Sequence, residues 1–491
     1  MKRYILPLLL ITILFACKKD DINNDNSNTA TLHFSTDTIT FDTVFASIGS
    51  ITKTLTVYNK NNFDVKSNIA LLGNSAAHFR MNIDGVAGNS QNNIEIPAKD
   101  SIFIFLEVTI DPSLNTTPYV LADSLVFTTG TQKQDVDVVA WGQDAHFHTA
   151  NSYGAIIDGN DTTLFPYHQL DCSEAWENDK PHVIYGYAVV DPEQTLIINE
   201  GCNVYLHKNS GILVGNPFSD QSGGSIKVNG TLGNEVTFQG DRLDSWYKDL
   251  PGQWDRIWLM PGSIDNEFNY VIIKNGNIGI HADTVANSNP TVTINNTIIK
   301  NMSSIGILGQ GANISAANTV VSRCGQYTVA CNIGGTYNFT HCTFANYWDF
   351  NNRSTPSILL NNYYEGADGN IYDRDLLAAN FTNCIIEGSL STEVSFQEQA
   401  GEFNYTFDHC LIKLDPTIDT DNEHYENVII NQSPKFKDNT ESDFHLTEDS
   451  PAIDAGSSDV FDNDFNNILK TDLDGLDRDL NNPDLGAYEF E

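Results

Sequence analysis

The densest group of residues that could bind or cleave a sugar lies between positions 361 and 377. Tyrosine rings stack against sugar rings, and carboxylates accept hydrogen bonds from sugar hydroxyls. The acids of this segment are candidate catalytic residues, and its tyrosines and arginine are candidate ligand-binding residues: Glu365, Asp368, Asp373 and Asp375 in the first group, Tyr363, Tyr364, Tyr372 and Arg374 in the second. Two carboxylates about 5–9.5 Å apart can hydrolyse a glycosidic bond. The alternative is a solvated loop whose acids only keep the protein soluble.

Trp246 and Tyr247 form a second candidate ligand-binding platform, because charged residues flank this aromatic pair. Such rings offer apolar faces to a ligand while their neighbours stay hydrated. Trp254 and Trp258 follow shortly afterwards, and we expect both to pack as core.

Asp472, Asp474 and Asp477 are candidate calcium ligands, because their spacing resembles part of a calcium loop. The bidentate Glu of an EF-hand would fall at position 483, which is Pro483, so the segment is not an EF-hand. The alternative is that these aspartates cap turns. His146 and His148 lie on one side of an extended chain, but two ligands are too few to predict a metal site. We expect no other cofactor.

The charge balance restricts the partners. Lys and Arg total 26 against 64 Asp and Glu, a formal net charge of -38. Such a surface repels phosphate backbones, which excludes nucleic acid as a partner and disfavours polyanionic glycans. Of the 8 cysteines, Cys17 lies near the N-terminus apart from the rest, and the odd number that remains argues against a disulfide scaffold.

Residues 1–16 have the pattern of a secretory signal peptide. Lys2 and Arg3 precede an apolar run of about eleven residues, whereas a membrane-spanning helix needs about 20. Ala16-Cys17 at its end resembles the bacterial lipobox, which implies cleavage after Ala16 and a lipid on Cys17 that anchors the chain to a membrane. Residues 17–30 are polar and predict a flexible tether. Lys18-Lys19-Asp20-Asp21 resembles the export signal of Bacteroidota surface lipoproteins, which implies an outer-membrane lipoprotein exposed on the cell surface.

Residues 31–143 alternate apolar and polar side chains, as in Ser101–Val108, with turn residues between the runs. Short alternating runs at this spacing predict an antiparallel β-sandwich. Phe41–Val44 followed by Thr54–Asn59 resembles immunoglobulin-like modules. Nothing in this region is typical of catalysis, so we interpret it as a spacer, followed by a connecting segment over residues 144–184.

A short motif then repeats along the chain. Its second residue lies at positions 270, 296, 318, 342, 384 and 410, so the steps are 26, 22, 24, 42 and 26 residues. Periods in the low twenties predict a β-solenoid, in which stacked coils bury a shared core. We expect Asn296 and Asn318 to stack with hydrogen-bonded amides, and Cys342, Cys384 and Cys410 to act as small core residues. The long step predicts an extra loop, or nearly a second coil, at the candidate sugar-binding segment.

Residues 185–433 resemble the right-handed parallel β-helix proteins of the pectin-lyase-like superfamily, on phrases such as Gly230–Gly233 and Val236–Phe238. The Gly-His-Gly and Arg-Ile-Lys triplets of its polygalacturonase-type hydrolases are absent. Residues 434–491, with Ser450–Gly456 and Pro483–Glu489, resemble a choice-of-anchor segment. We expect this segment to cap the open end of the solenoid, where strand edges would otherwise be unpaired.

The sequence therefore predicts an all-β chain with an immunoglobulin-like β-sandwich, a right-handed parallel β-helix and a C-terminal cap. The predicted function is that of a lipid-anchored surface protein that binds extracellular glycans or other polymers without turnover. Two alternatives stay open. One is a carbohydrate-active enzyme, a glycoside hydrolase rather than a polysaccharide lyase, and the other is a structural envelope component.

Overall fold

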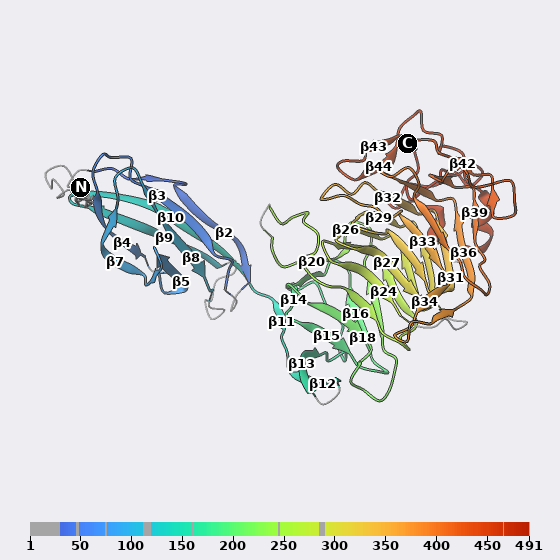
Figure 1. Ribbon diagram of the computed structural model, residues 1–491, viewed down its shortest axis with the longest axis horizontal. Helices are drawn as coiled ribbons and strands as arrows, with labels where there is room; N and C mark the ends of the chain where they lie inside the picture. Colours follow the sequence, from blue (N-terminus) through green and yellow to red (C-terminus); the bar gives the residue numbers. More distant parts are fainter. Residues whose placement is uncertain are drawn as a thin grey trace, which may run out of the picture. The chain divides into compact units, whose positions relative to one another are not determined.

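The computed structural model describes residues 30–45, 49–73, 76–110, 119–158, 161–243, 246–283, 290–464 and 466–490. These residues form β-strands and three short 3-10 helices, η2 (Ala76–His78), η3 (Ser458–Asn463) and η4 (Ile468–Lys470). The chain divides into two compact units, one up to Asp144 and one from Ala145 (Figure 1). The predicted signal peptide and Cys17 lie outside the described residues. No helix in the described ranges is long and apolar enough to cross a membrane.

The first unit packs two five-stranded sheets around one core. One sheet has the order β1 (His33–Phe34), β3 (Lys53–Tyr58), β8 (Ser101–Val108), β5 (Phe79–Ile83), β6 (Val86–Ala87), and the other the order β2 (Thr38–Phe45), β10 (Gln132–Gln143), β9 (Tyr119–Thr129), β4 (Val65–Leu72), β7 (Ser90–Ile96). The alternation predicted from the sequence is present, since Ile102, Ile104 and Leu106 are buried while Phe103 and Phe105 face outward. The prediction of a purely antiparallel sandwich was wrong at one edge, where β2 pairs with β10 in parallel. These strands are far apart in the sequence, so no tight hairpin fixes their relative direction.

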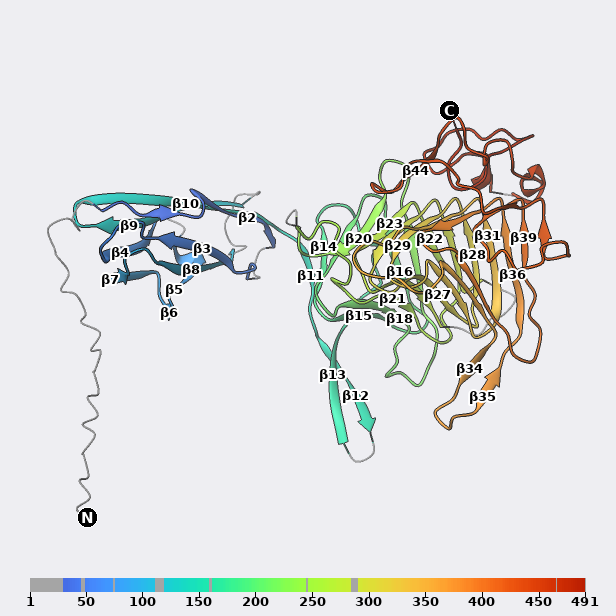
Figure 2. The same ribbon diagram turned by 45° about the horizontal axis from the view of Figure 1, so that its top comes forward.

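The second unit contains a parallel β-helix of three sheets (Figures 1 and 2). The eleven-stranded sheet has the order β11 (His146–His148), β14 (His182–Ile184), β17 (Asn203–Leu206), β20 (Val236–Gly240), β23 (Val271–Lys274), β26 (Ile298–Met302), β29 (Val320–Cys324), β32 (Thr343–Asn346), β37 (Ile385–Gly388), β40 (Leu411–Ile412), β42 (Ile429–Ile430). The ten-stranded sheet has the order β12 (Ser152–Asp158), β13 (Asp161–Gln169), β15 (Tyr187–Val190), β18 (Gly211–Val214), β21 (Ile257–Leu259), β24 (Ile278–Ala282), β27 (Ile305–Gln310), β30 (Val329–Asn332), β33 (Ile358–Asn361), β38 (Val394–Gln397). The nine-stranded sheet has the order β16 (Thr195–Asn199), β19 (Ser225–Asn229), β22 (Asn266–Asn269), β25 (Val292–Asn295), β28 (Asn313–Ala317), β31 (Gly335–Thr340), β36 (Leu376–Thr382), β39 (Thr406–Asp408), β41 (Tyr425–Glu426).

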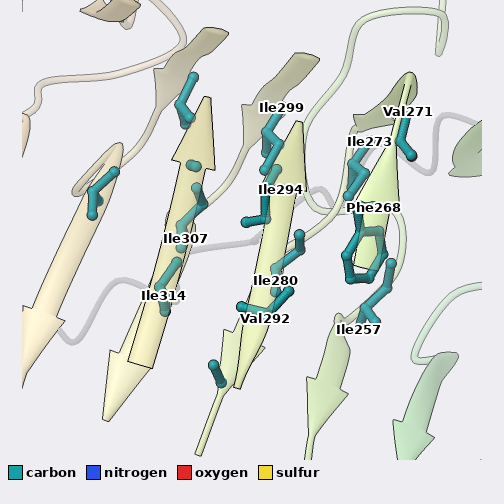
Figure 3. Packing of buried hydrophobic residues seen from close by; sticks show 14 of the residues in the cluster. Ile257, Phe268, Val271, Ile273, Ile280, Val292, Ile294, Ile299, Ile307 and Ile314 are labelled. Carbon is teal, nitrogen blue, oxygen red and sulfur yellow. The ribbon is translucent and has the colours of Figure 1, made fainter. Parts of the chain in front are cut away.

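Equivalent side chains form files through the interior of the β-helix, as the repeat predicted. Figure 3 shows Phe268, Ile294 and their apolar neighbours pointing into one shared core. Further along the same file, the rings of Phe339, Phe381 and Phe407 stack with centroids 4.9 Å apart at each step. Parallel pairing in register places each ring directly over the next. The all-β architecture predicted from the repeat is therefore confirmed.

The corner between the nine-stranded and eleven-stranded sheets contains a ladder of polar side chains in the left-handed backbone conformation. Its members are Tyr270, Asn296, Asn318, His341, Asn383, His409 and Asn427, with φ between 47° and 55°. Asn318 Nδ2 donates to Asn296 Oδ1 at 3.1 Å, which confirms the predicted amide stacking. The repeat placed Cys342, Cys384 and Cys410 in the same column as these asparagines, and this was wrong by one residue. Thr343 pairs with Val320, so Cys342 lies level with Thr319, and Cys384 and Cys410 follow Cys342 in register. In the three shifted coils a cysteine directly follows the corner residue His341, Asn383 or His409, and the sequence alone did not show which residue of each pair occupies the corner.

The cysteines of the repeat lie in the core, as predicted. Cys342, Cys384 and Cys410 are fully buried, and the seven cysteines of the described ranges are all free thiols. Burial raises the pKa of the Cys384 thiol well above its usual value, so this thiol is protonated and unreactive.

The segment 144–184 is more than the predicted connection. Its strands β11 and β14 already belong to the eleven-stranded sheet, and its β13 pairs in parallel with β15. The sheets of the β-helix therefore begin at His146. The strands of this segment lack the repeated motif, so the sequence did not reveal them.

The C-terminal segment, described over 434–464 and 466–490, lies along the side of the β-helix (Figure 2), which differs from the predicted end cap. It covers an apolar stripe on the outer face of the eleven-stranded sheet, where Val320 and Ala345 pack against Phe444 and Tyr488. Its backbone also bonds to the corner ladder, since Asn383 Nδ2 donates to Ser457 O at 2.9 Å. Covering this stripe removes apolar surface from water, which explains the position of the segment.

Asn318 is the ladder residue whose loss we expect to cost most stability. It is fully buried, and its Nδ2 contacts Asn296 Oδ1, Ile468 O and Thr471 O, while its Oδ1 accepts from Arg478. Asn318→Ala leaves buried groups unsatisfied, so the free energy of unfolding should fall by about 2 kcal/mol or more in urea titrations. The exposed amide Asn229→Ala is the matched control. Equal stability of the two variants would contradict a stabilising role of the ladder.

Two stacked histidines at the start of the β-helix predict acid sensitivity. His148 Nε2 lies 3.0 Å from His182 Nδ1, and both rings stack on Trp176. Burial, with neighbouring histidines adding to it, lowers the pKa of His148 from 6.5 to about 3 and that of His182 to about 4. As the pH falls, the histidines of the unfolded chain are therefore protonated before those of the folded chain. The contribution of the two neutral histidines to the free energy of unfolding is complete above pH 6.5 and declines as the pH falls toward 4.

His182→Phe keeps a ring against Trp176 and removes one titrating group. We expect its melting temperature to fall less between pH 7 and pH 4 than that of the unmodified chain. His33→Phe, at an exposed position of the first unit, is the control. Parallel pH profiles for all three proteins would refute the assignment.

Candidate functional site

The outer faces of the three sheets carry different side chains. The eleven-stranded sheet presents the apolar stripe that the C-terminal segment covers. The ten-stranded sheet presents buried apolar residues such as Leu308 and Leu359. The nine-stranded sheet presents short polar residues, and a pocket of about 350 Å³ opens on it.

The pocket spans the outward positions of β31, β36, β39 and β41, and its lining is Asn338, Phe339, Thr340, Asn380, Thr382, Thr406, Phe407, Asp408, Glu423, His424 and Glu426. The strand alternation explains this lining. Phe339, Phe381 and Phe407 point into the core, so the residues on either side of each point outward.

Two columns of side chains cross the pocket. Asn338, Asn380 and Thr406 form the first, since these residues are register partners. Asn380 Nδ2 donates to Asn338 Oδ1 at 2.9 Å, and Thr406 Oγ1 donates to Asn380 Oδ1 at 2.9 Å. These bonds fix the orientation of the Asn380 amide, so the column presents its polar groups in a defined order.

The second column ends in carboxylates. Thr340, Thr382, Asp408 and Glu426 are register partners on successive strands, so neighbours lie about 4.8 Å apart. His409 Nδ1 lies 2.6 Å from Asp408 Oδ1 and orients that carboxylate. Asp408 and Glu426 leave the same sheet face in the same direction. A pair that hydrolyses a glycoside must flank the bond, so this arrangement suits hydrogen bonding to hydroxyls better than cleavage.

His424 forms one wall of the pocket. Its ring stacks on Tyr405 with centroids 4.1 Å apart, and its Nδ1 lies 2.8 Å from Tyr405 O. The ring is therefore held from two sides and offers a fixed surface to a ligand.

The segment 361–377 forms a projecting hairpin of β34 (Tyr363–Glu365) and β35 (Ile371–Asp373), visible in Figure 2. The step of 42 residues is thus one coil with insertions. Tyr364 and Tyr372 stack on each other at 5.2 Å, and the Arg374 guanidinium lies 5.9 Å from the Tyr364 ring. The faces of these two rings contact each other. Tyr363 lies opposite Asp373 in the strand register of the hairpin.

Two of the four candidate acids of this segment accept hydrogen bonds from other residues. Asp368 accepts from the Tyr372 hydroxyl at 2.7 Å, which holds the pKa of Asp368 below its usual value and makes it a poor general acid. Asp375 Oδ1 accepts from Glu402 N at 3.0 Å. Glu365 and Asp373 are exposed on the hairpin. None of the four acids lines the pocket of the nine-stranded sheet.

The predicted aromatic platform is divided. Trp246 is 74% exposed, whereas the Arg242 guanidinium covers the Tyr247 ring at 3.3 Å. Trp254 is buried in the core, as predicted. Trp258 instead points out of the ten-stranded sheet and stacks on His281 at 4.8 Å, because strand alternation places it opposite to its buried neighbours Ile257 and Leu259.

Trp258 borders a polar chain that sequence reasoning missed. Arg256 Nε donates to Asp255 Oδ2 at 3.0 Å, and Arg256 Nη1 lies 3.3 Å from His281 Nδ1. His281 Nε2 lies 2.6 Å from Gln310 Oε1, and burial lowers the pKa of His281 to about 4. The imidazole is therefore neutral near pH 7, and both its nitrogens are engaged by the protein.

The candidate calcium ligands lie in different surroundings. Asp472 is buried, and its carboxylate accepts from the backbone N–H of Asp474, Leu476 and Glu489. Asp474 Oδ2 lies 2.8 Å from His445 Nε2, and Asp477 is exposed. Within the described ranges, no three His, Cys, Asp or Glu residues are grouped so that they could hold a metal ion.

The pocket itself was missed, although the sequence contains a signal for it. Asn338-Phe339-Thr340, Asn380-Phe381-Thr382 and Thr406-Phe407-Asp408 repeat a polar–Phe–polar triplet just before the corner residue. In a parallel stack such triplets place one Phe file inside and two polar columns outside.

Comparisons with solved structures give distant likenesses. A family 123 glycoside hydrolase from Clostridium perfringens shares 11% identity over 22% of this chain and 25% of that chain, with a TM-score of 0.16. The catalytic unit of the GH87 alpha-1,3-glucanase from Streptomyces thermodiastaticus strain HF3-3 shares 9% identity over 73% of this chain and 79% of that chain, with a TM-score of 0.19. The Dettilon tailspike protein shares 15% identity over 47% and 56% of the two chains, with a TM-score of 0.16. No protein-family model and no curated protein matches the chain.

Asp472→Asn tests whether this residue serves the backbone or calcium. We expect the substitution to lower the free energy of unfolding by about 1–3 kcal/mol with and without calcium, because backbone donors lose an acceptor. Asp477→Asn should leave stability unchanged. A rise in melting temperature on adding calcium, lost in either variant, would instead establish a calcium site.

Proposed function

We propose that this chain is a lipid-anchored, surface-exposed protein that binds an uncharged extracellular glycan in the pocket of the nine-stranded sheet, without turnover. The observation that carries the proposal is the pocket lining. Amide, hydroxyl and carboxylate groups are held at strand spacing on a rigid sheet, and such groups match the alternating donors and acceptors of sugar hydroxyls.

The charge of the chain supports an uncharged ligand. With 64 acidic against 26 basic residues, and with Asp408, Glu423 and Glu426 in the pocket, a polyuronide would meet repulsion. Neutral sugars have no such penalty, and a carboxylate acceptor strengthens each hydroxyl bond.

Binding without turnover is favoured over hydrolysis by the direction of the carboxylates. Asp408 and Glu426 are neighbours on one face, so neither lies opposite the other across a bound sugar. The glycoside hydrolase alternative and the structural alternative both make different predictions in the experiment below.

The test measures binding and turnover together. The chain from residue 18 onward is titrated with xylan, mannan, glucans and polygalacturonate, and new reducing ends are assayed after long incubation. We expect affinity for at least one uncharged polymer and no reducing ends. Asn380→Ala and Asp408→Asn should each weaken binding about tenfold, the value of one good hydrogen bond.

Thr237→Ala is the matched control, since Thr237 is a half-buried, outward-facing residue of the eleven-stranded sheet. It should bind as the unmodified chain does. Reducing ends that disappear in Asp408→Asn would establish the hydrolase instead, and the absence of any glycan binding would leave the structural role.

The proposed anchoring has its own test in cells. Cys17→Ser removes the thiol that the lipid would modify, so the variant should leave the membrane fraction. Protease accessibility on intact cells then reports surface display. Persistence of the variant in the membrane fraction would contradict lipidation.

A further inference from the structure

A strip of short uncharged side chains extends beyond the pocket on the nine-stranded sheet. It consists of the outward residues of β25, β28, β31 and β36 in two adjoining columns, and we name it the neutral strip: Thr293, Asn295, Ser315, Ala317, Asn338, Thr340, Asn380 and Thr382. The two columns continue without a register shift from β25 to the pocket. The strip therefore extends the pocket along the axis of the β-helix.

Charged side chains border the strip only at its two ends along these columns. Asp408 and Glu426 follow it on β39 and β41. Lys227 and Glu267 precede it on β19 and β22, where they pair with each other at 2.7 Å. None of the eight outward positions of the strip is charged, so a polymer that lies on it meets only short uncharged side chains.

The length of the columns suits an extended polymer. From β25 to β41 there are six neighbouring strands, which span about 24 Å at roughly 4.8 Å per step. A pyranose unit in an extended chain advances by a length comparable with one step. The side chains of the strip are short, so a flat chain can lie close to the sheet.

We propose that the ligand is a linear, uncharged polysaccharide that lies along the helix axis and continues from the pocket onto the neutral strip over β28 and β25. This inference rests on the proposed function, because the pocket supplies the first contacts. The strip then adds the half-buried hydroxyls of Ser315 and Thr293 at successive steps, and its lack of charge spares the polymer the desolvation of fixed ions. The ligand class is thus set by length as well as by charge.

A length series of oligosaccharides tests the inference. Oligosaccharides from two to eight units, prepared from the uncharged polysaccharide that binds, are titrated by calorimetry against the chain from residue 18 onward. We expect affinity to rise with length beyond the oligosaccharide that fills the pocket. Ser315→Arg places a long cation across the strip, so it should abolish this gain, about tenfold for the longest member, and leave short members unaffected.

Thr237→Arg adds the same side chain to the eleven-stranded sheet and should change the affinity for neither short nor long oligosaccharides. Affinity that is flat with length, or Ser315→Arg binding long members as the unmodified chain does, would overturn the inference. Short oligosaccharides that still bind and still respond to Asn380→Ala would then leave the proposed function intact. If the unmodified chain bound no oligosaccharide of any length, both the inference and the proposed function would be refuted.

Discussion

Parallel pairing in register is the constraint on which the second unit depends. Each coil adds one strand to each of three sheets, so a side chain can be buried only if its equivalents above and below fit the same space. The ring file from Phe339 to Phe407 meets this condition by stacking at 4.9 Å. The polar ladder at the corner meets this condition differently, because the amides of Asn296 and Asn318 hydrogen-bond to each other.

The same constraint turns the outer faces into continuous stripes. A residue type that recurs at one outward position becomes a column, and the chemistry of the column decides what can cover it. The apolar column that includes Val320 requires burial and receives the C-terminal segment. The polar columns that cross Asn338 and Thr340 need no cover and remain open as a pocket.

The C-terminal segment contacts both the polar ladder at the corner and the apolar stripe. Arg478 is buried, donates to Asn318 Oδ1 at 3.1 Å and pairs with Glu489 at 3.0 Å. A buried ion pair costs desolvation, and the added bonds to Asn318 and Gly486 O offset part of that cost. These contacts make the position of the segment specific, since a merely apolar cover could slide along the stripe.

The sequence by itself determined the repeat, the all-β architecture and the buried state of Cys342, Cys384 and Cys410, because periodicity reports which positions must share one core. It did not determine the later positions of the corner column, where His341, Asn383 and His409 lie in place of the cysteines that follow them. It also favoured the residues of the hairpin as a ligand site on composition alone. Only the tertiary structure decided that Tyr364 and Tyr372 stack on each other and that Asn380, Asp408 and Glu426 meet in a pocket. These residues are separated by whole coils, and their proximity follows from which strand lies over which, a relation that depends on the lengths of all the intervening loops.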